Sequence, residues 1–159
     1  GEFDQVDRVI FDLNNNPASR RIMTNIYNYQ DLHEMHLYPC AYSMTFNVSG
    51  NKLNAILNQR SQDVLAANNW NVVQYSILLH MMAQISGLVA GELVHVIADA
   101  HIYDRHVPII EKLIEMEEHE SPTLIMDNDI DNFYKFTVDS FKLNDYKFNP
   151  FKVKVPIAV

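Results

Sequence analysis

Apolar side chains recur at helical spacing in three stretches of the chain. The first covers residues 6–13, and the asparagine and proline residues that follow should end it. The longest covers residues 71–88, where apolar positions surround most of the helix, so we expect it to be nearly buried and to end at Gly87. A third helix is expected from Pro108, because proline suits a first turn and apolar positions continue to Met116.

An alternation of apolar and polar positions indicates β-strands elsewhere. Residues 41–48 and 52–60 alternate on either side of Ser49-Gly50-Asn51, a turn cluster typical of a β-hairpin. Shorter or weaker patterns predict further strands at residues 19–27, 92–97, 123–126 and 151–159, and a short helix at residues 130–136. With no repeat or linker, residues 1–159 are expected to form a single α+β domain with a mainly β-sheet platform, a long buried helix and several peripheral helices.

The composition limits the class of protein. The formal net charge of −8 argues against nonspecific binding to nucleic acid or to an anionic membrane. The single cysteine excludes an intrachain disulfide and fits a reducing compartment. No stretch approaches the roughly 20 apolar residues of a membrane span, and the first residues lack the basic and apolar regions of a signal peptide. We therefore expect a cytoplasmic protein.

The single cysteine, Cys40, has a setting that could make it reactive. Pro39 fixes its own backbone angle and favours an extended Tyr38, so Cys40 should enter the following strand from a defined direction. A cation such as Arg60 could hold the sulfur as a thiolate. The alternative is that Cys40 is a small, buried, apolar side chain without chemistry, as most free cysteines are.

Three kinds of site are compatible with the polar residues. A cysteine hydrolase would use Cys40 as the nucleophile with His101 and Asp99, provided that the fold brings the three together. A metal site would use pairs of nearby histidines, but HExxH and CxxC patterns are absent, so we expect no metal. The pairs are His33 with His36 and His101 with His106.

The third kind of site is a pocket for an anion. Arg20, Arg21, Arg60 and Ser61 could supply charge-assisted donors to a phosphate. Adjacent residues of a strand point to opposite faces, so Arg20 and Arg21 cannot both serve one local pocket unless one lies at a bend or reaches a partner chain. The residue types alone leave the choice between these sites open.

The order and spacing of these motifs resemble thymidylate synthase of the folate-dependent type that uses a cysteine nucleophile. The motifs are, in chain order, Asn16-Pro17-Ala18-Ser19-Arg20-Arg21, Pro39-Cys40, Gln59-Arg60-Ser61-x-Asp63, Asn71, Asp99-x-His101-x-Tyr103 and Val155-Pro156-Ile157-Ala158-Val159. The resemblance covers essentially all 159 residues and corresponds to the C-terminal part of the family's chain. The family's N-terminal part carries a further phosphate-binding arginine, a catalytic glutamate and tryptophans near the folate, and is expected to be missing from this sequence.

The resemblance implies reductive methylation of dUMP to dTMP, with 5,10-methylenetetrahydrofolate as the cosubstrate and no metal. Cys40 would add to carbon 6 of the pyrimidine as a thiolate, and Arg60 would favour the ionised sulfur. Asn71, whose amide can both donate and accept, would pair with O4 and N3–H of uracil. Asp99 would complete the catalytic set.

The resemblance also implies a set of side chains that bind dUMP. They would be Arg20, Arg21, Gln59, Arg60, Ser61, Asn71, His101 and Tyr103. His101 and Tyr103 would hold the sugar hydroxyl, which their spacing on one strand face permits. Arg20 and Arg21 would reach the phosphate bound in the opposite subunit of a homodimer, which would account for their adjacency.

The folate half of the site is where the sequence departs from the family's pattern. Asp63 would accept from the pterin ring, and Val159 would help to close the site. The departures are Ala41 for a histidine, Ala66-Ala67 for leucine-glycine, Asn69-Trp70 for proline-phenylalanine and Ala98 for a glycine. They leave two alternatives: a dUMP hydroxymethylase of the same family, in which water rather than hydride captures the transferred carbon, and a non-catalytic nucleotide-binding homologue or inactive fragment. The chain alone is expected to be inactive.

Overall fold

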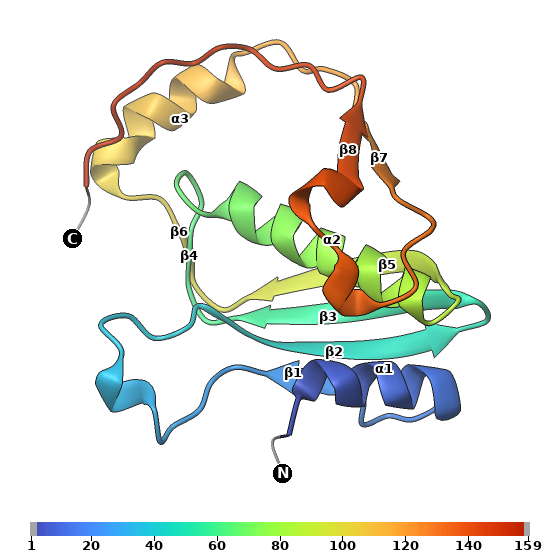
Figure 1. Ribbon diagram of the computed structural model, residues 1–159. Helices are drawn as coiled ribbons and strands as arrows, with labels where there is room; N and C mark the ends of the chain where they lie inside the picture. The colour runs from blue at the N-terminus through green and yellow to red at the C-terminus, as the bar shows by residue number, and fades with distance from the viewer. Residues whose placement is uncertain (1–2, 158–159) are drawn as a thin grey trace.

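The centre of the molecule is a four-stranded sheet. The computed structural model describes residues 3–157, and Figure 1 shows their arrangement. The strand order is β1-β2-β3-β5, formed by Met23–Asn25, Ala41–Ser49, Lys52–Gln59 and Val89–Ile97. β2 pairs antiparallel with β1 and β3, whereas β3 and β5 run parallel. Parallel neighbours need a crossover, and here it contains the helix α2.

Two helices cover one face of this sheet and form the core with it. α1 (Gln5–Asn15) lies along β1, and α2 (Asn68–Ile85) lies across β3 and β5 (Figure 1). Alternate side chains of β3 point into this core, and Leu53 and Leu57 are completely buried. Each such side chain contributes about 1.5–3 kcal/mol by leaving water. The core therefore fixes the positions of α2 and β3 relative to each other.

The opposite face of the sheet carries large aliphatic side chains beside polar ones such as Thr45 and Asn58, and no element among residues 3–157 covers it. Its outward positions on β1, β3 and β5 carry large aliphatic side chains that are 44–49 % exposed. These are Met23, Ile56, Val94 and Val96. An apolar patch that spans three strands is unusual on a free surface and is typical of a protein interface.

The sheet contains two irregularities at which one strand has an extra residue. In β2 the register shifts between Ala41 and Ser43, at the end of the strand next to Cys40. In β5 the second irregularity lies at Gly91, where a Cβ atom would collide with the side-chain oxygen of Asn54. That oxygen accepts from the N–H of Glu92 at 2.9 Å and so replaces a missing bond of the ladder. Such bulges bend a strand and redirect the neighbouring side chains.

The remaining elements form a second layer beyond the sheet. They are β4 (Gln62–Asp63), β6 (Ala100–His101), α3 (Val107–Ile114), β7 (Thr123–Met126) and β8 (Phe141–Asn144). β4 pairs parallel with β6, and β7 pairs antiparallel with β8. The C-terminal segment runs back along α3 (Figure 1). No helix in the described part of the chain is long and apolar enough to cross a membrane.

Most of the predicted elements are present, and the α+β class is confirmed. The hairpin β2–β3, the strands β5 and β7 and all three helices occur where the patterns predicted them. Gly87 has a φ of +64° directly after α2, so it ends this helix as expected. The long helix nevertheless starts at Asn68 rather than Asn71. The apolar pattern missed the start of the helix because Asn68 and Asn69 are polar and do not belong to the apolar repeat.

Two predicted strands were wrong in extent. The strand predicted for residues 19–27 contains only Met23–Asn25, because Ser19 Oγ accepts from the N–H of Arg21 at 3.2 Å and holds this segment in a turn. The strand predicted for residues 151–159 is absent over residues 151–157, and its last two residues lie outside the described part. The carbonyls of Pro156 and Ile157 instead accept from side chains of His106 and Arg105.

Other differences concern burial and short elements. The long helix α2 is not nearly buried: Leu79, Met82 and Ala83 are, but Trp70 is 78 % exposed. The strand β8 was not predicted, and the helix expected at residues 130–136 is a single 3₁₀ turn, Phe133–Lys135. The sequence pattern does not identify β8 because this strand depends on pairing with β7, which ends fifteen residues earlier in the chain.

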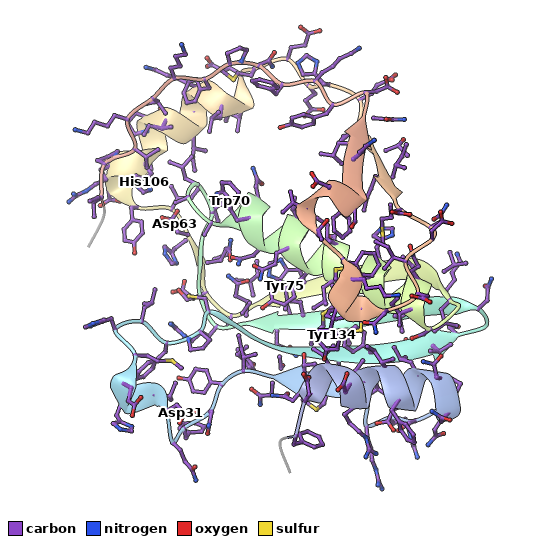
Figure 2. The ribbon with its side chains drawn as sticks, in the orientation of Figure 1. Asp31, Asp63, Trp70, Tyr75, His106 and Tyr134 are labelled. Atoms are coloured by element: carbon purple, nitrogen blue, oxygen red, sulfur yellow. The ribbon has the colours of Figure 1, made fainter. Side chains whose placement is uncertain are left out.

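A polar contact joins the last quarter of the chain to the start of α1. The Tyr134 hydroxyl lies 2.8 Å from Asp4 Oδ2 and 3.0 Å from Asp7 Oδ1, so it donates its proton to the first turn of α1 (Figure 2). This hydrogen bond lowers the pKa of Asp4 below its ordinary value of 3.8 and raises the pKa of Tyr134. A depressed carboxyl pKa means that the contact adds stability above pH 3.8 and loses it as the pH falls further.

We expect Tyr134→Phe to lower the Tm of the intact protein at pH 7, because it removes the donor to Asp4. The difference from wild type should shrink as the pH falls through the pKa of Asp4, because the protonated carboxyl no longer favours this donor. Tyr146→Phe is the matched control, since Tyr146 is also exposed and its hydroxyl has no hydrogen bond among residues 3–157. Calorimetry between pH 2.5 and pH 7 measures both. Equal Tm values for Tyr134→Phe and wild type at pH 7 would contradict the expectation.

Candidate active site

The predicted chemical residues gather at one end of the sheet, where β3 and β5 end and β2 begins. Main-chain pairing continues there beyond the strands: Arg60 N–H donates to Cys40 O at 2.9 Å, and Gln62 N–H donates to Asp99 O at 2.8 Å. Val64 N–H likewise donates to the carbonyl of His101 at 3.0 Å. The backbone therefore brings three separated stretches of sequence into one place.

Cys40 lies directly beside the guanidinium group of Arg60. Arg60 Nε donates to Pro39 O at 3.0 Å and Nη2 donates to Tyr38 O at 2.7 Å. These two carbonyls hold the guanidinium plane, and its Nη2 lies 3.7 Å from Cys40 Sγ. The sulfur is half-buried and free, directly before β2, as predicted. The guanidinium therefore lies within contact distance of the sulfur atom.

Asn71 is held by a buried amide. It lies in the first turn of α2, and its Oδ1 accepts from Gln59 Nε2 at 3.3 Å. The Gln59 side chain is 2 % exposed, and its Nε2 also donates to Ser61 O at 2.8 Å. Gln59 Oε1 lies 2.9 Å from His95 Nε2. All polar atoms of the Gln59 side chain are thus bound to other groups of the protein.

His101 and Tyr103 lie next to each other, as their spacing predicted. Their rings are 5.0 Å apart between centroids and meet edge to face. Asp99 Oδ2 is 3.6 Å from His101 Nδ1, too far for a hydrogen bond, and the Asp99 side chain is 70 % exposed. His101 Nδ1 is buried and has no hydrogen-bond partner among residues 3–157. The ring as a whole is partly exposed, so the part of the imidazole that a ligand could reach is not Nδ1.

Asp63 is fixed by its own loop and lies near a buried histidine. Its Oδ1 accepts from the N–H groups of Leu65 and Ala66, both at 3.1 Å. His106, which is almost completely buried, approaches the same oxygen at 3.8 Å (Figure 2). His106 Nε2 in turn lies 2.9 Å from the carbonyl of Pro156. The imidazole therefore binds the C-terminal segment and lies near the carboxylate without a hydrogen bond to it.

The adjacent arginines lie far from this site. The carbonyl of Ile22 accepts from Phe46 N–H at 2.9 Å, so Arg21 lies near Phe46 on β2. Cys40 precedes Phe46 by six positions, which corresponds to about 20 Å along an extended strand. Arg20 and Arg21 are both exposed, and their guanidinium groups bind no other residue of 3–157. They cannot complete the site next to Cys40 of the same chain.

The geometry bears on the cysteine hydrolase alternative that the residue types left open. Within residues 3–157 no hydrogen bond joins Cys40 to His101, so the hydrolase triad of Cys40, His101 and Asp99 is not assembled. No group of three potential metal-ligating side chains occurs in that range.

Two residues belong to the expected folate half of the site. Val159 lies outside the described residues. Ala67 has a φ of −127°, which any residue can adopt, so its methyl group does not strain the backbone there.

Sequence reasoning missed the structural roles of His95 and His106. His95 lies on the inner face of β5, where the neighbouring inward positions, Leu93 and Ile97, are apolar. A histidine in such a row is a detectable signal for a buried hydrogen bond. The sequence indicates His106 only as a possible metal ligand. Its partner, the carbonyl of Pro156, is fifty residues further along the chain, so no local pattern reveals the contact.

Comparison with known proteins identifies the family. The thymidylate synthase family model matches residues 1–159. The chain is 43 % identical over 144 residues to thymidylate synthase of Bacillus licheniformis, and 42 % identical over the same length to that of Bacillus phage phi3T. The chain belongs to the thymidylate synthase family. Each of these alignments covers 91 % of this chain and 52 % of the relative, so the chain spans about half the length of the curated thymidylate synthases that it matches.

The three-dimensional structure agrees with this membership. The thermostable thymidylate synthase A from Bacillus subtilis superposes with a TM-score of 0.92 at 38 % identity, over 96 % of this chain and 55 % of that one. The fold is therefore that of a thymidylate synthase over the part that the chain spans. The motifs at Cys40, residues 59–63, Asn71 and residues 99–103 meet at the end of the sheet, whereas the arginine pair does not, and Pro156 and Ile157 bind His106 and Arg105.

We expect Arg60→Leu to slow the alkylation of Cys40 by iodoacetamide about tenfold at pH 7, because the cation beside the sulfur is lost. Arg60→Lys should keep part of the rate, since it retains the charge but not both carbonyl contacts. Arg8→Leu, which removes an arginine on the surface of α1, should leave the rate unchanged. At pH 10.5, where thiols are ionised in any case, the variants should converge. Equal rates for Arg60→Leu and wild type at pH 7 would show that Arg60 does not activate this sulfur.

Proposed function

We propose that the full-length protein is a thymidylate synthase that converts dUMP to dTMP with 5,10-methylenetetrahydrofolate. The observation that carries this proposal is the contact between Cys40 Sγ and the fixed guanidinium of Arg60, in a member of this family. The thiolate would add to carbon 6 of the pyrimidine, and its electron pair would make carbon 5 an enolate nucleophile. Carbon 5 would attack the one-carbon unit, and loss of the proton from carbon 5 with cleavage of the bond between the one-carbon unit and the folate nitrogen would leave an exocyclic methylene. Hydride from the released tetrahydrofolate would then complete the methyl group as the Cys40 thiolate leaves carbon 6, which gives dTMP and dihydrofolate.

The nucleotide would lie across the end of the sheet. Asn71 would donate to O4 of uracil and accept from N3–H. His101 and Tyr103 would hold the sugar hydroxyl, which the contact between their rings and the partial exposure of His101 support. Gln59, predicted to bind dUMP, is buried behind Asn71 and would act through it rather than on the nucleotide. Asp99 would contribute from the exposed edge of the site.

The phosphate of dUMP would be bound by two subunits. Arg60 and Ser61 would contribute from the subunit that holds Cys40. Arg20 and Arg21 are about 20 Å from that cysteine, by the strand geometry above, so we propose that they act in the site of a second subunit. The uncovered apolar face of the sheet, which includes Ile56 and Val94, supports a homodimer packed through this face.

The folate would lie next to the nucleotide. The second oxygen of Asp63, which has no hydrogen bond among residues 3–157, would accept from the pterin ring. Val159 would help to close the site. No resident metal is required by this chemistry. We place the protein in the cytoplasm, with dUMP, folate and a second subunit as its partners and no membrane or nucleic acid among them.

We predict that the full-length protein forms a covalent complex with 5-fluoro-dUMP and 5,10-methylenetetrahydrofolate through Cys40. Intact-mass spectrometry should show the summed mass of protein, nucleotide and folate, because fluorine at carbon 5 prevents the next step. Cys40→Ala should bind 5-fluoro-dUMP without the covalent shift and should unfold at the wild-type temperature. A covalent shift in Cys40→Ala would refute the assignment. Product analysis with dUMP then separates methylation from the hydroxymethylation that the alternative requires.

We predict that mixing Arg21→Ala with Cys40→Ala subunits restores activity. Each heterodimer would contain one site with both wild-type residues, because Arg21 and Cys40 of one site come from different subunits. With full exchange, about one quarter of wild-type activity is expected, since half of the dimers are mixed and each has one intact site. Mixing Cys40→Ala with the double variant Arg21→Ala/Cys40→Ala is the control and should give none. Absence of rescue, with exchange verified by mass spectrometry, would exclude a shared site.

A further inference from the structure

Base recognition in this site depends on the orientation of one amide. Uracil presents an acceptor at O4 and a donor at N3, whereas cytosine presents a donor at N4 and an acceptor at N3. An asparagine can pair with either base, because rotation of its amide by half a turn exchanges its donor and acceptor. Asn71 can therefore select uracil only if another group fixes its amide.

The group that fixes Asn71 is Gln59, and its own orientation is determined by the main chain. A carbonyl oxygen can only accept, so Ser61 O at 2.8 Å requires the NH₂ end of Gln59. The second hydrogen of the same Nε2 then points to Asn71, whose Oδ1 accepts it at 3.3 Å. A rotated Asn71 would present an NH₂ group to the NH₂ group of Gln59, and the bond would be lost.

The other end of the Gln59 amide is bound by His95. Gln59 Oε1 lies 2.9 Å from His95 Nε2, across the parallel pairing of β3 and β5. Because Gln59 is 2 % exposed, water cannot readily replace this donor. Burial also lowers the pKa of His95 below 6.5, so its ring is neutral at pH 8 and carries one hydrogen. The contact requires that hydrogen to be on Nε2.

We propose that His95 is a positioning residue for base selection, because it holds the amide of Gln59 and thereby keeps Asn71 in the orientation that pairs with uracil. The inference rests on the proposed function, since it concerns the same nucleotide site. His95 itself does not touch the nucleotide. Without its donor, the buried Gln59 oxygen is unpaired and only the bond to Ser61 O still orients the amide, so the orientation of Gln59 is held less strongly and Asn71 can more readily rotate to pair with cytosine.

The first test measures the tautomer of His95 in the full-length protein and needs no activity. In protein labelled with ¹⁵N-histidine at pH 8, the His95 ring should be the Nε2–H tautomer, identified by comparison with His95→Gln. A ring with its hydrogen on Nδ1 could not donate to Gln59 and would overturn the proposal.

The second test compares the dissociation constants of dUMP and dCMP by calorimetry. His95→Leu, which fits the apolar inner face of β5 beside Leu57, should narrow the preference for dUMP about fivefold to tenfold. The change should come from weaker dUMP binding together with unchanged or tighter dCMP binding. A purely structural defect would weaken the binding of dUMP and the binding of dCMP to the same extent. His95→Gln, whose amide can donate to Gln59 Oε1, should restore much of the preference.

The outcomes separate this inference from the function on which it rests. A wild-type protein that binds dUMP preferentially, together with a His95→Leu variant of equal preference, would overturn the role of His95 alone. A wild-type protein that binds neither nucleotide would overturn the proposed function, whatever tautomer His95 adopts. His33→Leu, a change at an exposed histidine remote from these contacts, is the control and should keep the wild-type ratio.

Discussion

The site depends on the parallel pairing of β3 with β5. Two parallel strands place their carboxyl ends at the same edge of a sheet, and the connection between them must cross one face. Here that connection contributes Arg60 and Asp63 as it leaves β3, and Asn71 at the start of α2. The end of β5 leads to Asp99 and His101. The antiparallel pairing of β2 with β3, extended by the bond from Arg60 N–H to Cys40 O, brings the cysteine to the same edge.

Much of this arrangement follows from local sequence. The alternation over residues 41–60 with Gly50 between the strands defines a hairpin, and its regular register would place Cys40 opposite Ser61. The bulge between Ala41 and Ser43 shifts the pairing by one residue and brings Cys40 opposite Arg60, so the pattern predicts that the two lie close together but not their exact pairing. The neighbouring positions of His101 and Tyr103 were predictable for the same reason, since positions two apart on an extended chain share a face.

The features that could not be predicted depend on partners distant in sequence. Gln59 was expected to touch the nucleotide, yet its side chain is bound by His95, Ser61 and Asn71. One of these partners lies thirty-six residues away, and strand alternation alone does not reveal which inward positions meet across a parallel pair. The segment at Arg21 shows the opposite error: its residues suit a strand, but the hydroxyl of Ser19 binds the backbone first.

The contacts of Arg105 and His106 with the C-terminal segment have a consequence for how this segment can vary. Both side chains bind main-chain carbonyls, at Ile157 and Pro156. Every residue type has such a carbonyl, so substitutions in this segment leave the attachment points in place. An inserted or deleted residue between α3 and Pro156 has a different effect, because it changes the length of the segment and therefore which carbonyls lie opposite Arg105 and His106. Evolutionary drift in this tail is therefore constrained in length and comparatively free in composition.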